Sequence, residues 1–110
     1  DTFFQQMAAV AGLIPYHVAV GNQEKWNDFA GYNARFAMPG PAGDNRNFWH
    51  AVDLGVVHAL FLSSEHSLEA GSEQSAFVAA DLAAVDRALT PWVVVLLHRP
   101  LCALPAAREM

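Results

Sequence analysis

The sequence is poor in charge and in cysteine. Only 15% of its 110 residues are charged, and the net charge is −5. The six basic residues stand singly, without the basic patch that binding to nucleic acid or to an anionic membrane surface needs, so neither partner is expected. Cys102 is the only cysteine, which excludes an intrachain disulfide and a thiolate metal cluster built from this chain alone.

Long apolar runs are also lacking. The longest, Trp92 to Leu97, is far too short to span a bilayer. The first residues contain neither the basic and apolar regions of a signal peptide nor an initiator Met, so we expect a piece of a longer chain. Hydrophobic residues, by contrast, make up 54% of the sequence, more than an independent domain of this size needs. We therefore expect some of them to face segments of a parent protein.

The hydrophobic pattern predicts helices and strands in alternation. Helical spacing over residues 3–11 is followed by a short β-type run at 16–20. Residues 21–46 are rich in Gly, Asn, Asp and Pro, which predicts a long loop. Two strands are expected near 48–53 and 56–62. Together with the helix and strand that follow them, this order indicates an α/β fold.

The clearest helix is predicted over 72–89. Ser72 suits its N-cap, and Pro91 follows its end. The apolar stripe of this helix, which should face the core, consists of Val78, Leu82, Val85 and Leu89. The continuous apolar run at 92–97 is typical of a strand that is covered on both faces.

Two residues of metal-ligand type follow short apolar segments. Asn22 comes after Val20 and Gly21, and His98 comes after Leu97. Sites in open α/β sheets gather at the carboxyl ends of strands, and Gly21 would let the chain turn sharply there. An amide oxygen and an imidazole nitrogen suit Zn, Mn or Fe(II). Taken alone, an Asn in a turn and a packed His are the commoner readings, so both interpretations stay open at this point.

A series of short motifs runs through nearly the whole sequence. They are Gly21-Asn22-Gln23-Glu24, Tyr32-Asn33-Ala34-Arg35-Phe36-Ala37-Met38-Pro39, Asn47-Phe48-Trp49, Asp53-Leu54-Gly55-Val56-Val57-His58, Leu62-Ser63-Ser64-Glu65-His66, Gly71-Ser72-Glu73-Gln74, residues 81–87 and residues 90–95, ending in His98-Arg99-Pro100. The first two resemble the Gly-Asn-His-Glu and Tyr-x-x-Arg-Phe-x-Met-Pro motifs of purple acid phosphatases, and the others follow in that family's order. Residues 1–102 therefore resemble an internal part of a purple acid phosphatase, within the calcineurin-like metallophosphoesterase superfamily.

This resemblance implies a fold, a cofactor and an activity. Residues 1–110 would form part of a β-sandwich flanked by helices, incomplete at both ends. The family binds ferric iron beside Zn, Mn or Fe(II), and attack by metal-bound water or hydroxide hydrolyses a phosphate monoester. By the resemblance, Asn22 and His98 would ligate the divalent metal, and missing flanking segments would supply the other ligands. A secreted or vacuolar location follows from the family's habit alone.

Position 23 departs from the family's motif. Gln23 stands where the family has a histidine that helps to bind phosphate and to protonate the leaving group. A glutamine can donate a hydrogen bond but delivers no proton near neutral pH. His66, in a polar loop, could supply that acid function, although a solvated loop histidine is the plainer reading. Arg99 could bind a phosphate oxygen or could serve only at the surface.

Two functions from different classes follow. The chain is part of an acid phosphatase that hydrolyses phosphate monoesters, or it is a truncated or degenerate non-catalytic homologue that at most binds a metal weakly or packs against a partner. In both cases we expect the 110 residues alone to be inactive, because two ligands cannot hold a dinuclear centre.

Overall fold

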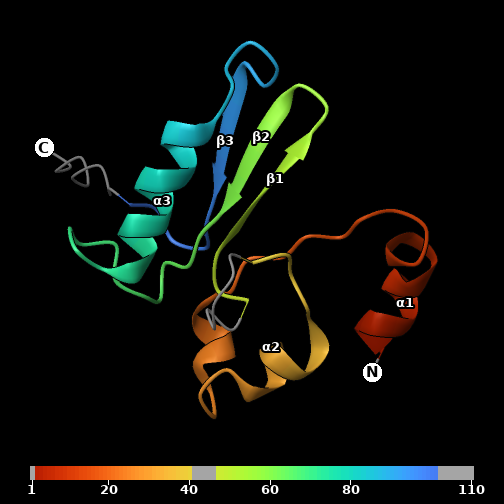
Figure 1. Ribbon diagram of the computed structural model, residues 1–110. Helices are drawn as coiled ribbons and strands as arrows, with labels where there is room; N and C mark the ends of the chain where they lie inside the picture. The colour runs from red at the N-terminus through yellow and green to blue at the C-terminus, as the bar shows by residue number, and fades with distance from the viewer. Residues whose placement is uncertain (1, 41–46, 102–110) are drawn as a thin grey trace, which may run out of the picture.

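The computed structural model of the protein describes residues 2–40 and 47–101 (Figure 1). The elements, in chain order, are α1 (Thr2–Ala11), the 3-10 helix η1 (Asn22–Lys25), α2 (Ala30–Arg35), β1 (His50–Leu54), β2 (Val57–Phe61), α3 (Glu73–Ala84) and β3 (Trp92–Leu96). Helices combined with one mixed sheet confirm the predicted α/β class. None of the described helices is long and apolar enough to cross a membrane.

The three strands form one sheet in the order β1-β2-β3. β1 and β2 pair antiparallel, with Asp53 opposite His58, and Gly55 takes the positive φ of 61° at the turn between them. β2 and β3 pair parallel, with Leu60 opposite Val95. A parallel pair needs a crossover connection, and α3 provides it (Figure 1). The two strands expected near 48–53 and 56–62 are confirmed, with slightly different ends.

The core lies where the ends of the strands meet the segment that carries η1 and α2. Its buried residues come from both parts of the chain: Val20, Phe29, Tyr32, Phe48, Trp49, Leu60 and Leu62. Aromatic rings contribute much of this contact, because Phe29 packs on Phe48 with ring centroids 4.7 Å apart. The core therefore anchors residues 20–36 beneath the carboxyl end of β2.

His58 ties α3 to the hairpin. Its Nδ1 lies 2.6 Å from Asp53 Oδ1 on β1, and its Nε2 lies 2.6 Å from Asp81 Oδ2 on α3. Burial lowers the pKa of His58, but the hydrogen bonds and charges of the two carboxylates outweigh burial and raise it overall. This histidine is therefore structural, because it connects the hairpin to α3.

α3 begins as predicted but ends early. Ser72 caps it, since the Ser75 N–H donates to the Ser72 hydroxyl at 3.2 Å. The chain leaves the helix at Val85, which has an extended backbone, so the expected continuation to residue 89 is wrong. The predicted core stripe is also wrong at two of its four residues, because Leu82 is 44% exposed and Leu89 is 72% exposed.

β3 is an exposed strand, whereas the sequence predicted one covered on both faces. Four of its five residues are exposed, with Trp92 at 67%, and only Val93 packs against the core. β3 is the edge of the sheet and pairs only with β2 among the described strands. The apolar run is typical of a strand that other elements cover on both faces, but the described residues cover only a small part of it.

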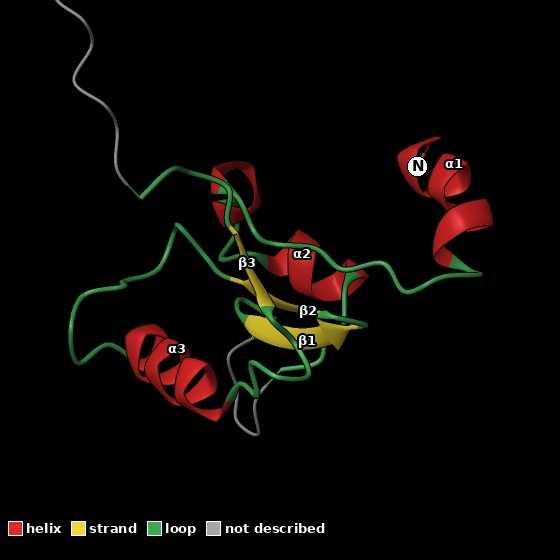
Figure 2. Ribbon diagram, turned by 90° about the horizontal axis from the view of Figure 1, so that it is seen from above, coloured by secondary structure: helices red, strands yellow, loops and turns green. Residues whose placement is uncertain are grey.

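Residues 16–35 differ most from prediction. The strand expected at 16–20 is wrong, because this stretch is extended but pairs with no strand in the described part of the chain. The loop expected at 21–46 contains η1 and α2, while 41–46 lie outside the described residues, as does Cys102. α1 is confirmed; it stands apart from the sheet in Figure 2 and buries none of its residues.

Candidate functional site

The side chains of Asn22 and His98 meet across 76 residues of sequence. Asn22 Oδ1 lies 2.6 Å from His98 Nε2, and since an amide oxygen can only accept, the imidazole Nε2–H donates. Asn22 opens η1, directly after the extended segment that ends in buried Val20. His98 follows the end of β3. The fold therefore brings together the two residues that the sequence proposed as metal ligands.

Gly21 allows this approach, but not in the way expected. The chain turns into η1 here, with the Glu24 N–H donating to the Gly21 carbonyl at 3.3 Å, but the Gly21 φ of −122° is backbone that any residue adopts, so the turn does not require glycine. A Cβ at position 21 would instead lie 2.9 Å from His98 Cγ, closer than real contacts allow. The Gly21 N–H also donates to Glu24 Oε2 at 2.9 Å, which closes the first turn of η1. Glycine is needed here because the imidazole ring lies against the backbone.

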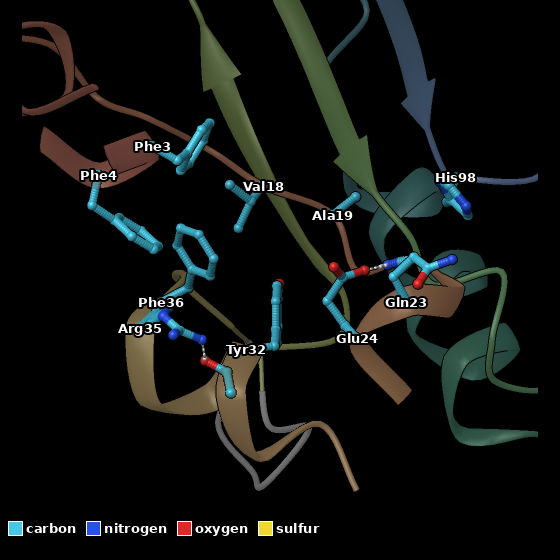
Figure 3. A pocket seen from close by; sticks show the side chains of 12 residues that line it. Phe3, Phe4, Val18, Ala19, Gln23, Glu24, Tyr32, Arg35, Phe36 and His98 are labelled. Atoms are coloured by element: carbon cyan, nitrogen blue, oxygen red, sulfur yellow. Dashed lines mark hydrogen bonds between the residues drawn. The ribbon is translucent and has the colours of Figure 1, made fainter. Parts of the chain in front are cut away.

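An open cavity of about 520 Å³ lies beside this pair. Figure 3 shows Gln23, Glu24 and His98 at one end and aromatic side chains at the other. The aromatic end is formed by α1 and α2, where the Phe4 and Phe36 rings lie 5.8 Å apart. Gln23 is exposed, so its amide is available to a molecule in the cavity.

Tyr32 of α2 also lines the cavity. Its hydroxyl donates to the Asn47 carbonyl at 2.9 Å. Burial, and next the nearby Glu24 carboxylate, raise the pKa of Tyr32 to about 12. The phenol therefore stays protonated and fixes α2 rather than taking part in proton transfer.

The donor chemistry of Asn22 and His98 fits part of a metal site. An amide oxygen and an imidazole nitrogen converge from two different segments, both accessible to solvent. Within residues 2–40 and 47–101, no group of three or more His, Cys, Asp or Glu side chains could hold a metal ion. This part of the chain offers two donors of one site, and not a complete coordination shell.

Similar proteins point to one family. No protein-family model matches the sequence. Purple acid phosphatase 18 of Arabidopsis thaliana is 36% identical over 91% of this chain and 24% of its own length. Probable inactive purple acid phosphatase 9 of the same species is 33% identical over 92% of this chain and 20% of its own length. This chain is a homologue of the purple acid phosphatases.

The fold agrees with that assignment. The structure of purple acid phosphatase PPD1 from yellow lupin (Lupinus luteus) seeds matches 90% of this chain and 20% of that chain, with a TM-score of 0.80 and 30% identity. The family resemblance and the partial α/β fold predicted from the motifs are thus confirmed. The chain spans about a fifth to a quarter of the length of the purple acid phosphatases that it matches.

His66 is half-buried and packs against the core, although the sequence suggested a solvated loop histidine. Its ring stacks on Phe48 with centroids 4.2 Å apart, and its Nδ1 lies 2.7 Å from the Ser63 hydroxyl oxygen. Burial, and next the charge of Lys25, lower its pKa. A neutral, packed imidazole is a poor proton donor, which weighs against the acid role proposed for His66 in a purple acid phosphatase.

Arg99 is engaged within the protein. Its Nε donates to Glu65 Oε1 at 2.7 Å, so the guanidinium suggested for phosphate binding already has an anionic partner. Sequence reasoning assigned no chemistry to Glu65. The only signal was its place in the family motif at 62–66, because an ion pair between residues 34 positions apart leaves no local pattern.

Proposed function

We propose that this chain supplies the divalent-metal half of the dinuclear centre in a phosphate monoester hydrolase of the purple acid phosphatase type. The observation that carries the proposal is the 2.6 Å approach of Asn22 Oδ1 to His98 Nε2. The names of the relatives, which include acid phosphatases, support the activity class. The missing ligands would come from segments outside the matched fifth to quarter of those proteins.

The residues of this chain would hold and orient rather than transfer a proton. Asn22 would bind the divalent ion through its amide oxygen and His98 through a ring nitrogen. When bound, the metal centre neutralises phosphate charge and lowers the pKa of the attacking water. Gln23 faces the cavity beside the pair and would donate an amide hydrogen bond to the substrate. It cannot protonate a leaving group near neutral pH.

A second candidate is a non-catalytic homologue. Gln23 occupies the position of a catalytic histidine, and one relative at 33% identity carries the name probable inactive purple acid phosphatase 9. In that case the half-site would bind a metal weakly, or would stabilise only the packing of the parent domain.

A chimera separates the two candidates. Residues 2–101 would replace the matched segment of Arabidopsis purple acid phosphatase 18, which restores the flanking ligands. We expect the purified chimera to retain its divalent metal, and Asn22→Ala or His98→Ala to remove it, as measured by elemental analysis. Gln5→Ala, on the exposed face of α1, is the matched control and should change nothing.

The outcomes of this experiment decide the function. Metal retention together with phosphatase turnover supports the enzyme. Metal retention without turnover supports the non-catalytic homologue, provided that Gln23→His restores turnover. Unchanged metal content in both ligand variants would refute the half-site itself.

A further inference from the structure

A buried carboxylate links the two segments that carry Asn22 and His98. Glu65 has a side chain only 2% exposed. Its Oε1 accepts from Arg99 Nε at 2.7 Å, and its Oε2 lies 3.2 Å from Lys25 Nζ. Arg99 directly follows His98, and Lys25 ends the short helix that Asn22 begins. The Glu65 carboxylate thus binds one cation from the segment of Asn22 and one from the segment of His98.

The surroundings of Glu65 show that it is the fixed member of this cluster. The Glu65 N–H donates to the Ser63 hydroxyl at 3.2 Å, and the Ser64 hydroxyl donates to Glu65 Oε1 at 3.1 Å. Lys25 and Arg99 are each 55% exposed at their side chains, whereas the carboxylate is enclosed. A buried carboxylate is tolerated when several donors satisfy it, and here these donors come from three separate segments.

The electrostatics favour an ionised Glu65. Desolvation by burial raises its pKa, but the hydrogen bonds from Lys25, Ser64 and Arg99 together outweigh this effect and lower the pKa below the ordinary value. The carboxylate therefore attracts both cations in the folded protein.

The backbone aligns the same segments. β2 and β3 are parallel, so their carboxyl ends meet at one edge of the sheet, and the Leu62 N–H donates to the Leu96 carbonyl at 2.9 Å just beyond it. The Arg99 N–H donates to the Ser64 hydroxyl at 3.3 Å. These bonds fix residues 62–65 against 96–99. They do not reach η1, for which the Lys25–Glu65 pair is the ionic connection.

We propose that Glu65 is a positioning residue that holds η1 and the segment after β3 at the separation in which Asn22 Oδ1 and His98 Nε2 face each other. As a statement about a metal site, this rests on the proposed function, but the geometry of the pair can be tested without any metal. Glu65 touches neither the ion nor the substrate in this role. It acts through Lys25 and Arg99.

The test reads the hydrogen bond between Asn22 and His98 directly. Nitrogen NMR shifts of the His98 ring in the 15N-labelled chain show whether Nε2 carries the proton that the pair requires. In Glu65→Gln we expect the fraction of His98 in the other tautomer to rise roughly two- to tenfold, the range that corresponds to losing one ordinary hydrogen bond. Asn22→Ala should give the same change, and Glu69→Gln, at an exposed carboxylate, should give none.

A second set of variants guards against unfolding. Lys25→Gln and Arg99→Gln replace half-exposed cations. The variant that carries both changes should match Glu65→Gln rather than exceed it, because both proteins lose the same connection between η1 and the segment after β3. The ring signals of His50 and His58 report on the rest of the fold and should not move. A His98 tautomer that is unchanged in Glu65→Gln and in the double variant would overturn the proposal. So would movement of all the histidine signals together, which indicates a general structural role.

The metal content of the chimera separates this proposal from the proposed function. We expect Glu65→Gln in the chimera to lower the amount of divalent metal that is retained, as measured by elemental analysis. If Asn22→Ala and His98→Ala leave the metal content of the chimera unchanged, but the His98 tautomer in this chain depends on Glu65 as described, the metal half-site fails and the positioning role stands. If those two variants lose the metal, but the His98 tautomer is unchanged in Glu65→Gln, the half-site stands and the positioning role fails.

Discussion

Replacing His50 with Phe should make the protein less sensitive to acid. His50 is buried at 1% exposure on β1, and its ring stacks on Phe61 with centroids 4.6 Å apart and planes 4° apart. Its Nε2 lies 3.1 Å from His17 Nδ1, and its Nδ1 has no hydrogen-bond partner among the described residues. Burial, and next the charge of His17, lower the pKa of His50 to about 4. The folded protein therefore resists protonation at this site.

The sign and the size of the effect follow from the pKa shift. Between about pH 6.5 and pH 4 the unfolded chain binds a proton at position 50 that the folded protein does not. The stabilising effect is complete above the unfolded pKa and is lost as the pH falls toward the folded one. A shift from 6.5 to about 4 corresponds to about 3 kcal/mol of unfolding free energy, an upper limit for His50 alone.

Urea unfolding followed by tryptophan fluorescence at several pH values measures this effect. We expect the unfolding free energy of His50→Phe to fall less steeply than that of the wild type as the pH is lowered, which makes the acid limb of its pH profile flatter. Its stability near neutral pH should change little, because Phe keeps the stack on Phe61 and removes the unpaired Nδ1. The limb should not vanish, because burial also lowers the pKa of His66. Gln5→Ala, at an exposed residue of α1, is the control. Equal acid limbs in the wild type and in His50→Phe would refute the reasoning.

Three further outcomes are expected. The two carboxylates raise the pKa of His58, so the stabilising effect of protonated His58 is present below about pH 6.5 and is lost as the pH rises through the raised pKa. Asp81→Asn removes one of these carboxylates, and in urea unfolding it should reduce the stability that the protein loses as the pH rises. In the chimera, Gln23→His should raise turnover of substrates with poor leaving groups by on the order of 10²–10⁴-fold, and turnover of nitrophenyl phosphate by less; equal gains would mean that position 23 serves only binding. Tyr32→Phe should lower the unfolding free energy by about 1 kcal/mol, because the bond to the Asn47 carbonyl is lost, and an unchanged urea midpoint would contradict this.

The parts of the fold that local sequence could predict are those with a clear period or cap. The hairpin of β1 and β2 and the Ser72 cap appear where the pattern placed them. The short helices η1 and α2 do not, because Gly and Asn in this stretch signal turns. There the helical backbone is stabilised by distant contacts, such as Phe29 and Tyr32 packing on Phe48.

The candidate site, like the fold, could be predicted from the sequence only in part. Asn22 and His98 were singled out because each follows a short apolar segment, and the resemblance to the family motifs then made them the predicted metal ligands. Gly21 was identified as important for the wrong reason, since its role depends on a ring that arrives from position 98. Glu65 had no periodicity, cap or turn to reveal it. Its importance arises only when three segments distant in sequence meet.

The arrangement explains why this segment could keep its site geometry while its chemistry changes. The pairing of Asn22 with His98 depends on the sheet, on the core beneath it and on the cations held by Glu65. None of these contacts involves the Gln23 side chain, which is exposed and faces the cavity. A substitution at position 23 can therefore alter proton transfer without disturbing the residues proposed to hold the metal. A relative named as probably inactive and one named as an acid phosphatase can accordingly resemble this chain to nearly the same degree, at 33% and 36% identity.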